Sequence, residues 1–179
     1  QYNFYPDPEQ RALRRALASY TGLGPDHIVV GNGSDEIIDL LLRLFVGPGD
    51  ETVIAPPTFG MYAFNTRLVG GRVVEAPRGE GFRLDLARME AMVTERTRLI
   101  LLASPNNPTG DLASRQEVLR LLEAGVPTVV DEAYYEFAGE SVADLVPRYQ
   151  NLIVLRTFSK WAGLAGLRVG YGLMAPSLA

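Results

Sequence analysis

The chain has 179 residues, and 47% of them are hydrophobic, which is enough apolar material for one globular domain with its own core. Its formal net charge is −4 with both signs mixed along the sequence, so composition gives no support to general nucleic-acid or membrane-surface binding. The absence of cysteine excludes disulfides, thiol nucleophiles and thiolate metal sites. We therefore expect a cytoplasmic protein with small-molecule or protein partners and no metal site. No run of about 18 apolar residues exists, so no membrane-spanning helix is expected.

Short β-rich apolar runs alternate with longer segments of helical periodicity, a pattern typical of a mainly parallel sheet covered by helices. In chain order it predicts a helix over 8–20, a strand over 28–31, a helix over 34–46, a strand over 52–55, a helix over 58–69, a strand over 72–75, a helix over 85–95, a strand over 98–103, a helix over 114–123, and strands over 126–130, 151–156 and 168–172. The predicted fold class is α/β, with a mostly parallel seven-stranded sheet flanked by helices.

Two helix starts carry local signals in the sequence. Ser34 opens a helical segment with acids in its first turn, and Ser114 is followed three residues later by Glu117, which is a capping-box pattern. These signals predict helix boundaries and carry no information about function.

Ligands of open α/β sheets collect beyond the carboxyl ends of the strands, so the residues after each apolar run are informative. "GNGSDE" follows the strand at 28–31, and free backbone N–H groups at Gly33, Ser34 and Asp35 could bind a phosphate at the helix start. "SPNNPTG" follows the strand at 98–103, and its prolines hold Asn107 where its amide could meet a ligand oxygen. A plain turn would also explain either stretch.

Charged and hydroxyl side chains follow two further strands. "DEAYYEF" places Asp131 at a strand end and Tyr134 three residues later, while "TFSK" places Thr157, Ser159 and Lys160 behind the strand at 151–156. Taken alone, the acid could be a helix cap or an ion-pair partner, and a single lysine is usually a solvated surface charge.

All of these polar groups would meet at one edge of the sheet. A lysine nucleophile, a carboxylate, a phosphate cradle and phenol and amide donors together describe a pyridoxal-phosphate pocket. Lys160 would form a Schiff base with the cofactor aldehyde, and Asp131 would pair with the pyridine nitrogen and keep it protonated. Asn107 and Tyr134 would hydrogen-bond the phenolic oxygen of the cofactor.

The phosphate would lie on the helix start at 33–35, with charge-assisted contacts from Thr157, Ser159 and the guanidinium of Arg168. Phe59, in "PPTFGMY", is placed to stack on the cofactor ring, and ordinary core packing is its alternative explanation.

Six stretches carry a resemblance to a known family, in family order and over essentially the whole chain: "YPDP" (5–8), "GNGSDEIIDLL" (31–41), "PPTFGMY" (56–62), "SPNNPTG" (104–110), "VVDEAYYEF" (129–137) and "RTFSKWAGLAGLRVGYG" (156–172). The chain resembles the fold-type I, pyridoxal-phosphate-dependent aminotransferases of class I/II, and most closely the histidinol-phosphate aminotransferases. The resemblance implies that these 179 residues form the large, cofactor-binding domain.

The resemblance also implies an activity and an assembly. The activity is transamination of L-histidinol phosphate with 2-oxoglutarate, giving imidazole-acetol phosphate and L-glutamate in histidine biosynthesis. The assembly is a homodimer in which Tyr5 reaches the cofactor phosphate of the neighbouring subunit, although a loop aromatic beside Pro6 is the simpler reading of Tyr5. Phe59 departs from this branch, which usually has tyrosine there.

Relatives of this kind continue into a C-terminal small domain, so we expect the chain to be a fragment of a longer protein. Aromatic aminotransferases and threonine-phosphate decarboxylases share the same motifs and stay open as alternatives. A non-catalytic, aminotransferase-like binding module is a third alternative.

Overall fold

Residues 3–179 are described by a computed structural model, in which seven strands form one sheet. The strands are β1 (Ile28–Asn32), β2 (Glu51–Ile54), β3 (Arg72–Glu75), β4 (Thr97–Ala103), β5 (Thr128–Asp131), β6 (Leu152–Thr157) and β7 (Val169–Leu173). Their order is β1-β7-β6-β5-β4-β2-β3, and β7 runs antiparallel to both of its neighbours while the other pairs are parallel. The predicted α/β class and mostly parallel seven-stranded sheet are confirmed.

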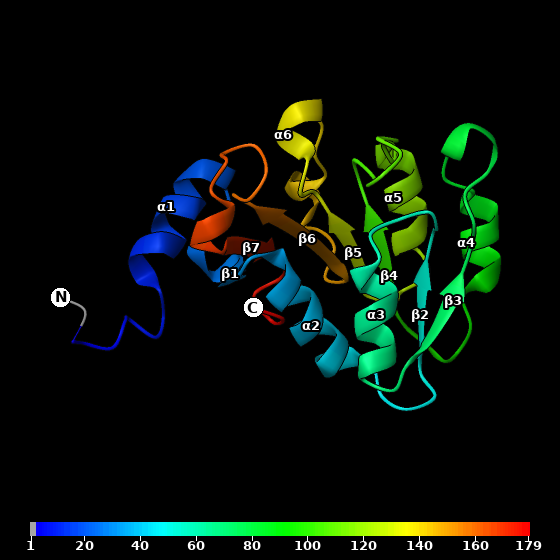
Figure 1. The fold of residues 1–179 in the computed structure, drawn as a ribbon, viewed down its shortest axis with the longest axis horizontal. Helices are drawn as coiled ribbons and strands as arrows, with labels where there is room; N and C mark the ends of the chain where they lie inside the picture. The colour runs from blue at the N-terminus through cyan, green and yellow to red at the C-terminus, as the bar shows by residue number, and fades with distance from the viewer. Residues whose placement is uncertain (1–2) are drawn as a thin grey trace.

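Helices cover both faces of this sheet (Figure 1). They are α1 (Arg11–Thr21), α2 (Ser34–Phe45), α3 (Met61–Leu68), α4 (Leu86–Met92), α5 (Arg115–Leu122) and the one-turn α6 (Tyr135–Ala138). The helices α2 and α3 pack on one face, and α1, α4 and α5 pack on the other. Alternate residues of β4 point to opposite faces of the sheet. Leu99 and Leu101 pack on the side of α2 and α3, and Ile100 and Leu102 pack on the side of α1, α4 and α5.

The structure moves several predicted helix boundaries inward. α1 begins at Arg11 rather than residue 8, and α3 begins at Met61 rather than residue 58, because the preceding residues form turns. The short helix α6 was not predicted, since one turn is too short to show a helical period. None of the helices described within residues 3–179 is long and apolar enough to cross a membrane.

The two predicted helix starts have different outcomes. The capping box at α5 is confirmed, because Ser114 Oγ accepts from the Glu117 N–H at 3.3 Å and Glu117 Oε2 accepts from the Ser114 N–H at 2.7 Å. At α2 the cap is Gly33, and Ser34 is already the first helical residue. A glycine is needed there because φ is +80° at Gly33.

Candidate active site

A cavity of about 170 Å³ opens where the carboxyl ends of β4, β5 and β6 meet the first turn of α2 and the segment before β7. This is the edge at which open α/β sheets bind ligands. The residues that the sequence predicts for the site and that line this cavity are Gly33, Ser34, Asp35, Phe59, Asn107, Asp131, Tyr134, Thr157, Ser159, Lys160 and Arg168. Tyr5, the remaining predicted residue, does not line the cavity, and its side chain is fully exposed.

Asp131 lies at the end of β5, and its side chain is buried. Its Oδ2 accepts a hydrogen bond from the Tyr62 hydroxyl at 2.7 Å, and its Oδ1 accepts from the Ala133 N–H at 3.1 Å. None of the ion pairs found within residues 3–179 includes this carboxylate. Burial raises the pKa of Asp131 to about 6, although both hydrogen bonds oppose the rise. A buried carboxylate without a cation is suited to receive a positively charged group of a ligand.

Tyr62 is a site residue that the sequence analysis did not assign. It comes from the first turn of α3, is fully buried, and lines the cavity beside Phe59. Burial, followed by the nearby Asp131 carboxylate, raises the pKa of the Tyr62 hydroxyl well above its ordinary value. A sequence signal existed, because a phenol on the buried face of a predicted helix needs a hydrogen-bond partner.

The first turn of α2 forms one corner of the cavity. The Gly33 N–H is not free, since it donates to the carbonyl oxygens of Gly31 at 2.9 Å and Arg168 at 3.0 Å. The expectation that three free N–H groups point to a ligand is therefore wrong for Gly33. The N–H groups of Ser34 and Asp35 have no acceptor inside the helix, because the first turn lacks the preceding carbonyls. These two are the donors that α2 can offer to an anion.

Arg168 lies over the same corner, immediately before β7. Its Nη1 donates to Ala165 O at 3.2 Å and Ser159 Oγ at 3.4 Å, and its Nη2 donates to Asn32 O at 3.3 Å. Nη2 also lies 3.6 Å from Asp35 Oδ2. The backbone of Arg168 is left-handed, with φ of 50°, which is uncommon for a residue with a side chain. The exposed guanidinium lies at the cavity, and its one ion pair among those found within residues 3–179 is with Asp35.

Thr157 and Ser159 complete this corner from the end of β6. The Thr157 hydroxyl donates to Ser159 Oγ at 3.0 Å and accepts from the Ser159 N–H at 3.1 Å. Both residues line the cavity, and Lys160 follows directly after them. Two hydroxyls, two helix N–H groups and one guanidinium therefore surround a space suited to a phosphate.

Lys160, Tyr134, Asn107 and Phe59 form the remaining walls. The Lys160 side chain is exposed, and its Nζ lies 5.4 Å from the centre of the Tyr134 ring. Asn107 is exposed at the rim on the segment after β4. Phe59 is half-buried and meets Tyr62 edge to face, with ring centres 5.5 Å apart. Phe59 therefore packs against the core and also lines the cavity. Its core packing is confirmed, and its stacking on a cofactor ring stays a prediction.

Comparison with known proteins places this chain in a family. The family described as aminotransferase class I and II matches residues 1–179. The chain belongs to the class I and II aminotransferases.

Among individual proteins, the chain is similar to histidinol-phosphate aminotransferases. It is 54% identical over 179 residues to the enzyme of that name from Dehalococcoides mccartyi (strain ATCC BAA-2100 / JCM 16839 / KCTC 5957 / BAV1), covering 100% of this chain and 50% of the relative. It is 49% identical to the chloroplastic histidinol-phosphate aminotransferase 1 of Arabidopsis thaliana, covering 97% of this chain and 42% of the relative.

A solved structure gives the same result. The histidinol-phosphate aminotransferase from Sinorhizobium meliloti, in complex with pyridoxal-5'-phosphate, superimposes with a TM-score of 0.89 at 33% identity, covering 97% of this chain and 49% of that chain. The chain thus spans about half the length of the relatives that it matches.

Proposed function

We propose that this chain is the pyridoxal 5'-phosphate-binding large domain of an aminotransferase that converts L-histidinol phosphate and 2-oxoglutarate to imidazole-acetol phosphate and L-glutamate. The observation that carries the proposal is the presence, in one cavity, of Lys160, the buried carboxylate of Asp131 and the anion corner at α2. Similarity to histidinol-phosphate aminotransferases supports the substrate. The cytoplasm remains the proposed compartment.

The residues present fit this cofactor in charge and shape. The Asp131 carboxylate has no cation within residues 3–179, and a protonated pyridine nitrogen would supply one. The corner formed by Ser34, Asp35 and Arg168 offers N–H and guanidinium donors suited to a phosphate. The half-buried ring of Phe59 is an apolar wall for a flat aromatic ring.

The chemistry divides between the cofactor and the protein. When bound, pyridoxal 5'-phosphate supplies an electron sink for the bonds at the substrate Cα. Asp131 would hold the proton on the pyridine nitrogen, and Tyr62 holds Asp131 in place through its hydroxyl. Asn107 and Tyr134 would donate hydrogen bonds to the phenolic oxygen, and Arg168, Thr157 and Ser159 would hold the phosphate.

Lys160 has two proposed roles. With pyridoxal 5'-phosphate bound, its amine would hold the cofactor covalently, and the same amine would act as the general base toward the proton on the substrate Cα. Its exposed side chain at the cavity mouth leaves the amine accessible to both partners. Homodimerisation, with Tyr5 contributing to the neighbouring subunit's site, is a further part of the proposal, and full exposure of the Tyr5 ring leaves it available for such a contact.

An absorption experiment tests the function. Purified full-length protein should take up pyridoxal 5'-phosphate and become yellow, and Lys160→Ala should lose the visible band because the covalent attachment is lost. Adding L-histidinol phosphate should bleach the wild-type band, whereas L-phenylalanine and L-threonine phosphate should do so much less. A colourless wild type would contradict the cofactor, and a response to one of the other two donors alone would assign the substrate to an alternative.

A further inference from the structure

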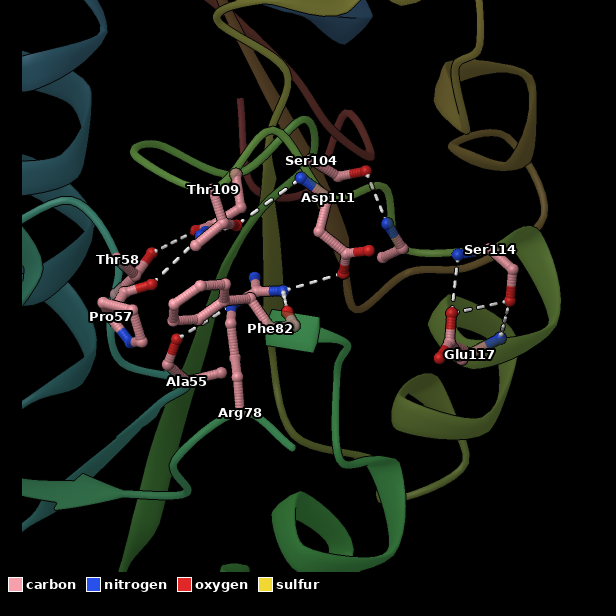
Figure 2. A network of polar contacts seen from close by, with 12 residues as sticks. Ala55, Pro57, Thr58, Arg78, Phe82, Ser104, Thr109, Asp111, Ser114 and Glu117 are labelled. Carbon is pink, nitrogen blue, oxygen red and sulfur yellow. Dashed lines mark hydrogen bonds and ion pairs between the residues drawn. The ribbon is translucent and has the colours of Figure 1, made fainter. Parts of the chain in front are cut away.

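Two segments next to the cavity are joined by a buried polar network that lies outside the site itself. One is the segment over 55–60 after β2, which carries Phe59, and the other is the segment over 104–111 after β4, which carries Asn107. Figure 2 shows the network, with Pro57 and Thr58 facing Thr109.

Asn106 is the centre of this network, and its side chain is buried, with 3% exposed. Its Oδ1 accepts from the Thr58 hydroxyl at 2.7 Å, and its Nδ2 donates to Pro57 O at 3.0 Å and to Thr109 Oγ1 at 2.8 Å. Because the Pro57 carbonyl can only accept, the nitrogen of the amide must face it, and this fixes the orientation of the side chain. Both amide hydrogens and the amide oxygen of Asn106 are therefore satisfied.

The Asn106 backbone closes the turn that presents Asn107. The Asn106 N–H donates to Asp111 O at 2.8 Å, and the Asn106 carbonyl accepts from the Gly110 N–H at 2.7 Å. The segment over 106–111 is thus held by its own backbone, and the side chain of Asn106 attaches it to the segment after β2.

Arg78 makes a second connection between the same two segments. Its side chain is 1% exposed, its Nε donates to Ala55 O at 3.2 Å, and its Nη1 donates to Asp111 Oδ2 at 3.0 Å. Figure 2 shows Arg78 between Ala55 and Asp111. Because the guanidinium is buried, breaking either contact would leave one of its N–H donors without that partner, so Arg78 holds the ends of β2 and β4 together.

Position in the chain connects this network to the cavity. Thr58 directly precedes Phe59, and Asn106 directly precedes Asn107, so the hydrogen bond between Thr58 and Asn106 joins the neighbours of two cavity-lining residues. A shift at this bond would move Phe59 and Asn107 relative to each other.

We propose that Asn106, supported by Arg78, is a positioning residue that sets the spacing of Phe59 and Asn107 across the cofactor pocket. This inference rests on the proposed function, since the pocket is the one assigned to pyridoxal 5'-phosphate. Asn106 acts through its neighbours and makes no contact with the ligand, so changing it should alter how well the ring fits and how Asn107 meets the phenolic oxygen.

The test uses Thr58, because removing one hydroxyl is less disruptive than truncating Asn106. In full-length protein, Thr58→Val should weaken pyridoxal 5'-phosphate binding about three- to tenfold, the loss expected for one hydrogen bond. Thr58→Ser, which keeps the hydroxyl, should restore affinity to within about twofold. Asn106→Asp should cause a larger loss than Thr58→Val, because a carboxylate oxygen would then face the Pro57 carbonyl.

A matched control separates positioning from general destabilisation. Thr128 is fully buried at the start of β5, far along the strand from the cavity, and its hydroxyl donates to Val126 O at 3.1 Å. Thr128→Val should lower the melting temperature and leave cofactor affinity unchanged. Thr128→Val should also leave unchanged the pH at which the visible band of the bound cofactor shifts. Thr58→Val should move that pH, because it would alter the proposed hydrogen bond from Asn107 to the phenolic oxygen.

The outcomes distinguish the two proposals. A wild-type protein that binds no cofactor contradicts the proposed function. A wild type that binds, together with a Thr58→Val variant that matches it in affinity and pH response, contradicts the positioning role. Equal losses in Thr58→Val and Thr128→Val would also contradict it, because the effect would then be general.

Discussion

Asp131 and Glu132 follow one another in the chain, and their buried carboxylates lie on opposite faces of the sheet, where they meet different partners. Asp131 accepts two hydrogen bonds from neutral donors, Tyr62 and the Ala133 N–H. Glu132 accepts from Arg156, with the nearest atoms 2.9 Å apart, and from Ser141 Oγ at 2.8 Å.

We infer from this difference that Glu132 stabilises the fold and that Asp131 is available to a ligand. Glu132 has its cation inside the protein, so it ties β5 to the end of β6 and needs nothing further. Asp131 is buried at similar depth, and its charge is left for another molecule to compensate. Three substitutions test this division.

The largest effect is expected from Glu132→Gln. This change leaves the Arg156 guanidinium buried without a counter-charge, and we expect the free energy of unfolding to fall by about 3 to 5 kcal/mol. Denaturant unfolding at neutral pH measures it. Asp144→Asn, which removes the partner of Arg115 in an exposed ion pair, is the control and should have little effect. Equal effects of the two changes would mean that the buried pair has no special structural role.

Asp131→Asn should not lower the stability of the cofactor-free protein at neutral pH as Glu132→Gln does, because the wild-type carboxylate is poorly compensated there. The folded-state pKa of about 6 lies above the ordinary value of 3.8, so this group contributes stability that is present below pH 4 and is lost as pH rises through 6. The loss amounts to about 3 kcal/mol. The asparagine variant should lack this pH-dependent fall and should bind cofactor poorly.

Unfolding of cofactor-free protein between pH 4 and pH 8 measures this difference directly. The wild type and Asp131→Asn should show parallel curves above pH 7 and diverge across the window between pH 4 and pH 6. Superimposable curves over the whole range would show that Asp131 is compensated from within the protein.

The smallest effect is expected from Tyr62→Phe, which removes one donor from Asp131 and leaves the ring in place. The pKa of Asp131 should rise beyond about 6, because the Tyr62 hydrogen bond lowers it in the wild type. At pH 7 the variant should lose about 1.5 kcal/mol of stability, and less below pH 5, where the carboxyl is protonated. A pH midpoint that does not move would assign Tyr62 to core packing alone.

The sequence predicted the elements of the fold more fully than their directions. All seven strands lie where apolar runs and turn residues place them, because buried strands show continuous β-branched segments. The reversal of β7 was not predicted, since hydrophobic pattern is the same for a strand read in either direction. Gly170 allows β7 to lie this close to the start of α2, because a Cβ there would collide with the backbone of Gly33 and Ser34.

The candidate site was predictable where single residues follow a strand, as with Asp131 and Lys160. The roles of site residues were not predictable where they depend on contacts with residues far away in the sequence. The Tyr62 hydroxyl and the Asn106 amide both act on segments far away in the sequence, and spacing along the chain does not report such pairs. The Gly33 N–H was misjudged for the same reason, because its acceptor is the carbonyl of Arg168.

The reversed direction of β7 has a consequence for changes in chain length. Because β6 and β7 are antiparallel, the connection over 158–168 begins and ends on the same side of the sheet, at the carboxyl end of β6. Parallel neighbours are instead joined by a crossover that returns to the opposite ends of the strands. An insertion in a crossover can therefore lie at the amino ends of the strands, away from the cavity. An insertion between Lys160 and Arg168 would stay at the cavity, because both residues line it, so a change in the length of this connection would fall directly on the site.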